Sequence, residues 1–519
     1  MFSKKTIIKK TLAISGFTWI SRCLGIARDI LMMRYLGYGI TSDAFVTAYK
    51  IPNSLRKIFA EGALSAVFIP IIVRNFKTMG QKGVNDLITF GFVVFEGTLL
   101  LICALVMFNA ELVISWMAPG FSSAQVQATI PCLQIVMPFI FFISSSALLA
   151  GALQSIGHFF VPASAPILLN VVFIASLLIC DYFVLPVQAL CWFLLAGGAL
   201  QLLAHLITYF HVGFGFGRLR LADFKQFNHV LVKFFPCLLG MGVMEIGLIV
   251  DQYFTSFLPA GSTSLHTYAG NFLRLPLGIF GVAFSTVLLP HFSRVAETTP
   301  HRLQFYLLEV AKLIFWIMFP LTLIMAFFSE KIFITMFLSE KFTMLHVQQA
   351  AYTLQAFLVG LFFFAYNKIL LNMYYALHDV WNPAYITIIA VVTNAILNSL
   401  LFTPLALPGI ALATSLSEIV RTLLFLLVLS SVAKIHFNSL RFITFAAWYI
   451  MQIIFLGLPF LAIYYGIEYS IARLPASMYH FLSQSLGFWL WVGPLICIFF
   501  IVAWLTRKYF NIHVYFLDQ

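Results

Sequence analysis

Long apolar segments, separated by short polar stretches, follow one another along this chain almost without interruption. Each is long enough to cross a bilayer as a helix, because about 20 apolar residues span the hydrocarbon core. A spanning helix also satisfies its own backbone hydrogen bonds, which lipid cannot do. We therefore predict an all-α integral membrane protein with about fourteen transmembrane helices. The expected spans are 8–35, 44–72, 86–109, 129–155, 159–180, 186–211, 228–257, 268–292, 305–328, 346–376, 383–403, 408–432, 442–467 and 481–507.

The composition agrees with this class of protein. The chain is 62% hydrophobic and 9% charged, whereas a soluble domain carries about 25% charged residues. Its net charge of +12 would suit a nucleic-acid partner, but most basic residues flank apolar segments, so we expect no nucleic acid. The first apolar run carries Arg22 and Arg28 and shows no small-residue cleavage site, which favours an uncleaved first span.

Basic residues are distributed unevenly between alternate loops. Seventeen Lys and Arg residues lie at the N-terminus and in the loops after spans two, six, eight, twelve and fourteen, against three in the opposite loops. The positive-inside rule then places both termini and the loops 73–85, 212–227 and 433–441 in the cytoplasm. The same rule places 110–128 outside.

The chain also contains a weak internal repeat. The string ALSAVFIP at 63–70 is similar to AFSTVLLP at 283–290, and Pro-Ala pairs at 162–163 and 383–384 lie 221 positions apart. A period of about 220 residues that holds six helices predicts two six-helix lobes related by a pseudo-two-fold axis along the membrane normal. The expected parts are a first lobe 1–211, a second lobe 212–432 and a C-terminal helix pair 433–519.

Charged residues are concentrated in the first two spans. A charge at the centre of a membrane helix costs about 3 kcal/mol on insertion scales, so such residues are usually functional and face a wet cavity. These charged residues include Arg22, Arg28, Asp29, Arg34, Asp43, Lys50, Arg56, Lys57 and Glu61. With Lys57 paired to Glu61 on one helix, cations still outnumber nearby acids. The surplus favours an anionic cargo, because the guanidinium fork binds phosphate bidentately. Self-neutralising pairs that merely permit insertion are the alternative.

Later spans carry fewer polar groups. Span eight holds Asn271 and Arg274, which lie on adjacent turns of one face. Span seven holds Glu245 and Asp251, which are candidates for binding Na⁺ or H⁺, although Asp251 near the outer end is equally compatible with a solvated position. Isolated Glu418 and Arg421, three positions apart, are expected to pair locally. The Cys and His residues show no metal-ligand spacing, and no motif for enzyme chemistry is present, so we expect neither metal nor cofactor.

Several of these residues form motifs that resemble the bacterial lipid II flippase family (MurJ, or MviN). The likeness begins in the first two spans and continues through most of the chain. The matching motifs are Arg22-x-x-Gly25-x-x-Arg28-Asp29, Asp43-Ala44-Phe45, Pro52-Asn53-x-Leu55-Arg56-Lys57-x-Phe59-Ala60-Glu61-Gly62, Tyr268-Ala269, Pro276-Leu277-Gly278-Ile279-Phe280-Gly281, Leu288-Leu289-Pro290 and Tyr375-Ala376-Leu377-His378-Asp379.

The resemblance implies the fold of the multidrug/oligosaccharidyl-lipid/polysaccharide exporters, with a central cationic cavity and a lipid-tail groove beside the last two spans. It implies diphosphate-sugar contacts for Arg22, Arg28 and Arg56, and cavity or gating roles for the acids. The implied acids are Asp29, Asp43 and Glu61, and Ser264 matches a polar position of the family. Where the family often has Asp-Arg after Tyr-Ala, this chain has Gly270-Asn271, so Arg274 is expected to supply that cation.

The resemblance therefore implies a flippase of the bacterial inner membrane that moves lipid II to the periplasmic leaflet by alternating access. Its partners would be lipid II, membrane lipids and cell-wall synthesis proteins. Coupling to Na⁺, H⁺ or the membrane potential is compatible with such a transporter, but no residue pattern of the sequence specifies it. One alternative is a related flippase for another lipid-linked oligosaccharide, and another is a multidrug or cation antiporter, which should favour acids in its cavity. A non-transporting cell-wall scaffold is the alternative from a different class.

Overall fold

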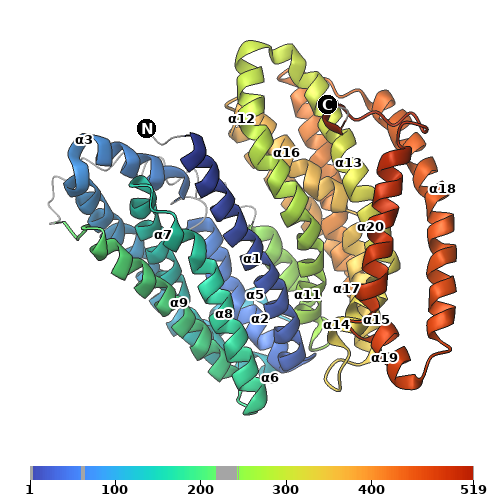
Figure 1. The fold of residues 1–519 in the computed structure, drawn as a ribbon. Helices are drawn as coiled ribbons and strands as arrows, with labels where there is room; N and C mark the ends of the chain where they lie inside the picture. The colour runs from blue at the N-terminus through green and yellow to red at the C-terminus, as the bar shows by residue number, and fades with distance from the viewer. Residues whose placement is uncertain (1–3, 60–64, 218–241, 243–244, 518–519) are drawn as a thin grey trace. The chain divides into compact units, whose positions relative to one another are not determined.

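The computed structural model describes residues 4–59, 65–217, 242 and 245–517, and these residues form helices joined by short connections (Figure 1). Among them the only β pairing is an isolated bridge between Ser339 and Phe342. The chain divides into two compact units, Met1–Ser264 and Leu265–Gln519. It is a multi-pass, all-α membrane protein, as the apolar segments predict.

The first unit contains long helices and a few short ones (Figure 1). They are α1 (Lys4–Leu36), α2 (Ile40–Arg56), α3 (Ser65–Gly91), the π-helix η2 (Phe92–Glu96), α4 (Gly97–Phe108), α5 (Ala110–Met117), α6 (Ser123–Val136), α7 (Phe139–Ser155), α8 (Phe160–Tyr182), α9 (Val187–His211) and a helical stretch at 245–255. Within this unit α1 packs against α8, α2 against α6, and α9 against both α7 and α8.

The second unit begins inside α11 (Ser262–Pro276). Its other helices are the π-helix η3 (Leu277–Gly281), α12 (Val282–Thr298), the 3₁₀ turn η4 (Pro300–Arg302), α13 (Leu303–Phe327), α14 (Ser329–Phe337), α15 (Met344–Leu358), α16 (Leu361–Ala376), α17 (Trp381–Ser431), α18 (Ser439–Ile471), α19 (Ala476–Gln484), α20 (Phe488–Thr506) and the 3₁₀ turn η5 (Tyr515–Leu517). Here α16 packs against α12 and α17, and α18 packs against α13 and α20.

The helix boundaries repeat along the chain with nearly the spacing that the sequence shows. The helices α8 and α17 begin at Phe160 and Trp381, and α7 and α16 end at Ser155 and Ala376. Both pairs are 221 positions apart. The internal repeat is therefore present in the backbone of the two units, and the placement of each predicted lobe in the membrane stays a prediction.

The turns between these helices repeat as well. Gly157 has φ 79° and His378 has φ 59°, again 221 positions apart. Only glycine enters this left-handed region freely, so the non-glycine His378 is held there by its surroundings. Asp379, the next residue, accepts hydrogen bonds from the backbone N and the side chain of Asn382 at 3.1 and 2.6 Å, which fixes the start of α17.

Eight helical stretches in the described part of the chain are long and apolar enough to cross a membrane, and a bent helix pair makes a ninth. The bent pair is α15 with α16, which meet at 43°. One of the eight, α17, covers two expected spans, 383–403 and 408–432, and breaks at Ala406, where φ is 50°. The expected total of fourteen spans thus stays a prediction.

Three expected spans differ in detail from the helices that form. The span 129–155 is interrupted between α6 and α7, the span 346–376 between α15 and α16, and 481–507 between α19 and α20. Pro138 stands at the first interruption and Gly360 at the second. Proline removes a backbone donor and glycine costs helix stability, so both breaks follow from local chemistry.

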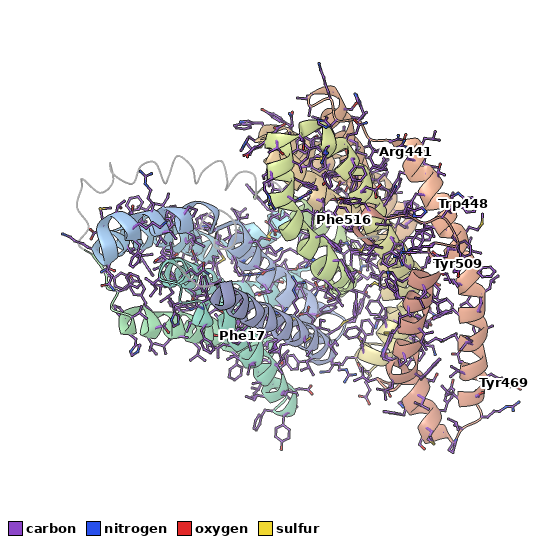
Figure 2. The ribbon with its side chains drawn as sticks, turned by 45° about the horizontal axis from the view of Figure 1, so that its top comes forward. Phe17, Arg441, Trp448, Tyr469, Tyr509 and Phe516 are labelled. Atoms are coloured by element: carbon purple, nitrogen blue, oxygen red, sulfur yellow. The ribbon has the colours of Figure 1, made fainter. Side chains whose placement is uncertain are left out.

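The last helices of the second unit pack through aromatic side chains. Phe445 and Tyr449 of α18 and Phe499 of α20 belong to one buried cluster. On the outer side of α18, Trp448 and Tyr469 are exposed (Figure 2). Such side chains suit a lipid-facing surface, because lipid is as apolar as the protein interior.

The C-terminal segment folds back onto α13. The backbone N–H of Tyr515 donates to Oε2 of Glu309 at 3.0 Å, and Lys312 pairs with the other oxygen of Glu309 at 2.7 Å. The ring of Phe516 lies 6.4 Å from that of Tyr306, centroid to centroid (Figure 2). These contacts attach the end of the chain to the second unit.

Candidate functional site

Asp43 joins three segments of the first unit at the start of α2. Its carboxylate is almost fully buried, with 1% of the residue exposed. Oδ1 accepts the backbone N–H of Ser264 at 2.8 Å, and Oδ2 accepts the N–H of Gly261 at 2.6 Å and Nε2 of Gln125 at 3.1 Å. Two of these donors lie at the N-terminus of α11, where a negative charge is favourable. Asp43 therefore holds α2 to α6 and to the start of α11.

Close packing around Gly261 extends this junction. Gly261 has φ 98°, and a Cβ at that position would lie 2.6 Å from atoms of the Tyr38 ring. Ser264 Oγ donates to the carbonyl of Gly261 at 2.8 Å and lies 2.9 Å from Oγ of Ser42. Burial raises the pKa of the Tyr38 phenol, and the nearby Asp43 raises it further, so Tyr38 stays neutral in this loop. Ser264 thus contributes to the same junction as Asp43.

Lys57 pairs with a carboxylate from a distant part of the unit. Its Nζ lies 3.1 Å from both carboxylate oxygens of Glu245, and Ser54 Oγ donates to Oε2 of Glu245 at 2.8 Å. The sequence-based expectation gave Lys57 to Glu61, which lies outside the described residues. Glu245 is therefore engaged by α2, whereas the sequence suggested a cation-binding carboxylate.

A second contact joins α2 to the same helical stretch at 245–255. Lys50 Nζ donates to Oε1 of Gln252 at 2.7 Å, and Gln252 Nε2 donates to Thr47 Oγ1 at 3.0 Å. Asp251, one position earlier, is 4% exposed, so the solvated alternative for this residue is wrong. Contacts of Lys50 and Lys57 on one side of α2 show that this side faces the stretch 245–255.

Arg28 is fully engaged on its own helix and on α8. Its Nη2 lies 2.7 Å from Oδ1 of Asp29, and its Nη1 donates to Oδ1 of Asn170 at 3.1 Å. The guanidinium carbon also lies 5.7 Å from the centroid of the Phe173 ring. Among the cations of the first two spans, Arg28 is thus paired with the acid that follows it in the sequence. About a quarter of each of the two side chains remains exposed.

The other two arginines of the first spans are placed differently. Arg22, near the middle of α1, is exposed. Arg56, at the end of α2, donates from Nε and Nη2 to Oδ1 of Asn53 at 3.2 and 3.0 Å. The resemblance to the flippase family implies that both side chains face the transport pathway. That last placement stays a prediction.

In the second unit, Arg274 and Asn271 lie on one face of α11, as their spacing predicts. Arg274 Nη1 donates to Oδ1 of Asn271 at 3.2 Å, and Arg274 is exposed. The local pairing of Glu418 with Arg421 is also confirmed, with an N–O distance of 3.2 Å. In addition, Asn367 of α16 donates to Glu418 at 2.7 Å, so this pair also holds α16 to α17.

Sequence reasoning missed the neutral partners of these charges. Asn170, Gln125 and Gln252 are amides, and none forms part of a recognised charge motif. The available signal was a polar amide inside or beside an apolar run, because such a group needs a hydrogen-bond partner in a low-dielectric interior. Among the described residues, no three His, Cys, Asp or Glu side chains gather closely enough to hold a metal ion.

Comparison with known proteins identifies the family. The family described as "Lipid II flippase MurJ" matches residues 32–479. The chain belongs to this family. The MurJ match includes Asp43, Lys57 and Glu245, so the contacts of these residues lie within the part of the chain that the family shares.

Individual relatives agree with the family assignment. A probable lipid II flippase MurJ of Buchnera aphidicola is 32% identical over 80% of this chain and 83% of its own length. The lipid II flippase MurJ of Burkholderia cenocepacia is 31% identical over 77% of this chain and 79% of its own length. These MurJ relatives thus match most of the chain.

Solved structures show the same fold. A lipid II flippase MurJ in an inward closed conformation has a TM-score of 0.77 at 24% identity, covering 96% of this chain and 99% of that one. An inward-facing MATE-family multidrug transporter has a TM-score of 0.69 at 15% identity, covering 79% and 94%. At these identities the likeness shows the fold alone.

Proposed function

We propose that this chain moves lipid II from the cytoplasmic to the periplasmic leaflet of the bacterial inner membrane by alternating access. The observation that carries the proposal is the family match over residues 32–479, and the MurJ relative of Buchnera aphidicola matches 80% of the chain. The protein acts as a transporter and not as an enzyme. The diphosphate-sugar head crosses the membrane inside the protein, while the polyprenyl tail stays in lipid.

The arginines are proposed to recognise the diphosphate. Arg22 is exposed on α1, and Arg274 is exposed on α11. A guanidinium forms paired N–H···O bonds with phosphate oxygens, which a lysine cannot do with the same geometry. Arg56 is proposed to join them by exchanging its Asn53 contact for a phosphate oxygen. The proposed role of Arg28 differs from that of the other arginines, because Asp29 and Asn170 hold its guanidinium in place. Arg28 therefore presents its charge without changing its position.

Asp43 is proposed to stabilise one conformation of the cycle. Its three hydrogen bonds join α2, α6 and the start of α11. Any rearrangement that moves α11 away from α2 has to break two of them and leaves a buried carboxylate without donors, which is costly. Asp29 and Glu61 are proposed as further acids of the pathway. Asn271 and Ser264 are proposed as polar contacts along it.

Transport is tested with the purified protein in liposomes. Fluorescent lipid II in the inner leaflet becomes accessible to an external quencher or modifying enzyme only after translocation. Replacement of Arg22 by Ala should reduce the rate at least tenfold, whereas Arg441→Gln, an exposed residue in the first turn of α18, should leave the rate unchanged. Failure of the wild-type protein to translocate lipid II would contradict the proposal.

The same assay separates the alternatives. A flippase for another lipid-linked oligosaccharide would move that lipid faster than lipid II. A multidrug or cation antiporter, suggested by the likeness to MATE transporters, would release a cationic dye against a Na⁺ or H⁺ gradient. A scaffold would move none of these substrates, and neutralisation of Arg22 would leave its function in cells intact.

Orientation follows from the loop charges, and it is tested by cysteine labelling. We propose that both termini are cytoplasmic, so a cysteine placed in 110–128 should react only with reagent added from the periplasmic side. We also propose that cell-wall synthesis proteins lie near the transporter, which crosslinking in intact cells tests. Transport is proposed to draw on Na⁺, H⁺ or the membrane potential, which imposed gradients in the liposome assay would distinguish.

A further inference from the structure

Glu96 is a buried carboxyl group that the proposed transport pathway does not use. It ends the π-helix η2 (Phe92–Glu96), between α3 and α4, and 1% of the residue is exposed. Ser144 Oγ, on α7, donates to Oε1 of Glu96 at 2.7 Å. Within the described part of the chain, Oε2 of Glu96 and the neighbouring Ser145 Oγ are both buried without a hydrogen-bond partner.

The described surroundings of Glu96 contain no cation that neutralises it. The facing helix α7 has no titratable residue, and on α4 the nearest titratable group is Cys103, whose thiol contacts the carbonyl of Met137 at 3.6 Å. The charged residues of α3 are Arg74, Lys77, Lys82 and Asp86. The three basic ones are exposed, and Asp86 lies ten positions before Glu96 along the helix, about 15 Å away. An ionised carboxylate in this setting carries its full desolvation penalty, whereas a protonated one does not.

A neutral carboxylic acid also fits the hydrogen-bonding groups. The protonated form has one O–H donor and keeps acceptor capacity on its other oxygen. Oε1 already accepts from Ser144, and the hydroxyl of Ser145, the next residue on α7, lacks a partner, so an O–H on Oε2 would have that Oγ as its acceptor. Protonation therefore satisfies both of the buried atoms that lack a partner.

The internal repeat shows that helix packing alone does not require a π-turn with a buried carboxyl group at this place in the fold. The equivalent positions of the second unit, 315–317, are Phe-Trp-Ile within α13, which is α-helical throughout. The second unit thus builds the corresponding helix without a π-turn and without a carboxyl group. A π-turn is uncommon and is found frequently at functional sites, because it re-aims side chains within a helix.

We propose that Glu96 is a proton-binding site, at which a carboxylate takes up one proton and becomes a neutral acid held by Ser144 and Ser145. Resting on the proposed flippase function, we further assign this proton to the transport cycle. Conversion of the π-turn to an α-helix removes one extra residue from the turn and rotates the carboxyl by about 100° to another face. Gly97, which follows η2 and has open space around its Cβ position, permits this change. The released proton would then leave from that face.

The protonation state is tested without any transport measurement. Infrared spectra of the purified protein in lipid should show a protonated carboxyl C=O band at pH 7 that is absent from Glu96→Gln. The band should shift in Ser145→Ala, which removes the acceptor, and should be unchanged in Glu111→Gln, which alters an exposed carboxyl group. A wild-type spectrum that matches Glu96→Gln throughout the protonated-carboxyl C=O region at pH 7 would show that Glu96 is ionised and would overturn the proposal.

The role in the cycle is tested separately in liposomes. Glu96→Gln mimics the neutral acid, so it should still fold and bind lipid II, but its translocation rate should lose its dependence on pH between 6 and 8. The wild type should change at least threefold over that range at constant Na⁺. A wild-type response to Na⁺ that survives in Glu96→Gln, with no response to pH in either protein, would overturn the coupling role. If neither protein translocates lipid II, the flippase function fails, whereas the infrared result still decides the proton site.

Discussion

Lys57 and Glu245 form an ion pair between segments 188 positions apart, with Nζ of Lys57 3.1 Å from the carboxylate of Glu245. The two side chains are 28% and 13% exposed, so the pair is partly shielded from water. Ser54 binds the same carboxylate, one turn before Lys57 on α2. The end of α2 is therefore attached to the helical stretch at 245–255 by charge and by a hydroxyl group.

Separating this pair should destabilise the protein. In a double-mutant cycle with Lys57→Met and Glu245→Gln, the two changes should be non-additive by about 1 kcal/mol, because each single change leaves a partly buried partner behind. Thermal unfolding of the four proteins in detergent measures this coupling. Strict additivity would mean that the ion pair contributes nothing to the stability of the folded protein, and that any effect of Lys57 on stability comes from its other contacts.

Removal of the whole Asp43 carboxylate should lower the free energy of unfolding more than removal of its charge alone. Asp43→Ala leaves three buried donors unpaired and should lower the free energy of unfolding by at least about 2 kcal/mol, since each unpaired group costs about 1–3 kcal/mol. Asp43→Asn keeps an acceptor oxygen and should cost less. Chemical or thermal unfolding measures which of the two variants is less stable. The matched control is Asp181→Ala at an exposed carboxylate, and equal losses in all three variants would contradict the assignment.

Gly261 should not accept a side chain. Gly261→Ala meets both the left-handed backbone at φ 98° and the Tyr38 ring at 2.6 Å, so we expect a loss of about 1–3 kcal/mol in unfolding free energy. Gly457→Ala is the control, because it lies within α18 with no atom close to its Cβ position. That control should be neutral or slightly stabilising. A stable Gly261→Ala variant would show that the junction around Asp43 can shift to make room.

Arg274 should provide the cation of α11 for transport. Arg274→Ala should abolish rescue of flippase-depleted cells while the protein still reaches the membrane at normal levels, as immunoblotting of membranes would show. The double change Asn271→Arg with Arg274→Ala should recover part of the function, because position 271 lies on the same face one turn earlier. Normal lipid II translocation by Arg274→Ala alone would leave the arginines of the first two helices as the only cations required.

Much of the helical framework was predictable from the chain. The expected span 159–180 corresponds to α8 at Phe160–Tyr182, and 305–328 corresponds to α13 at Leu303–Phe327. Apolar runs of this length form helices whatever surrounds them, because lipid leaves the backbone no other partner. Short helices such as α5 and α14 were not predicted, since eight or nine residues give too little periodic signal.

The candidate site was only partly predictable. The sequence by itself determined which charged residues enter apolar helices, and it determined local pairs such as Glu418 with Arg421, because residues three apart share a helix face. Only the tertiary structure decided that Lys57 contacts Glu245, that Arg28 is shared by Asp29 and Asn170, and that Asp43 joins three segments. Except for Asp29, which follows Arg28 directly, these partners lie far apart along the chain, and helical periodicity carries no information about which faces of two distant helices meet. That choice is made by packing, which brings most buried donors and acceptors together with a partner.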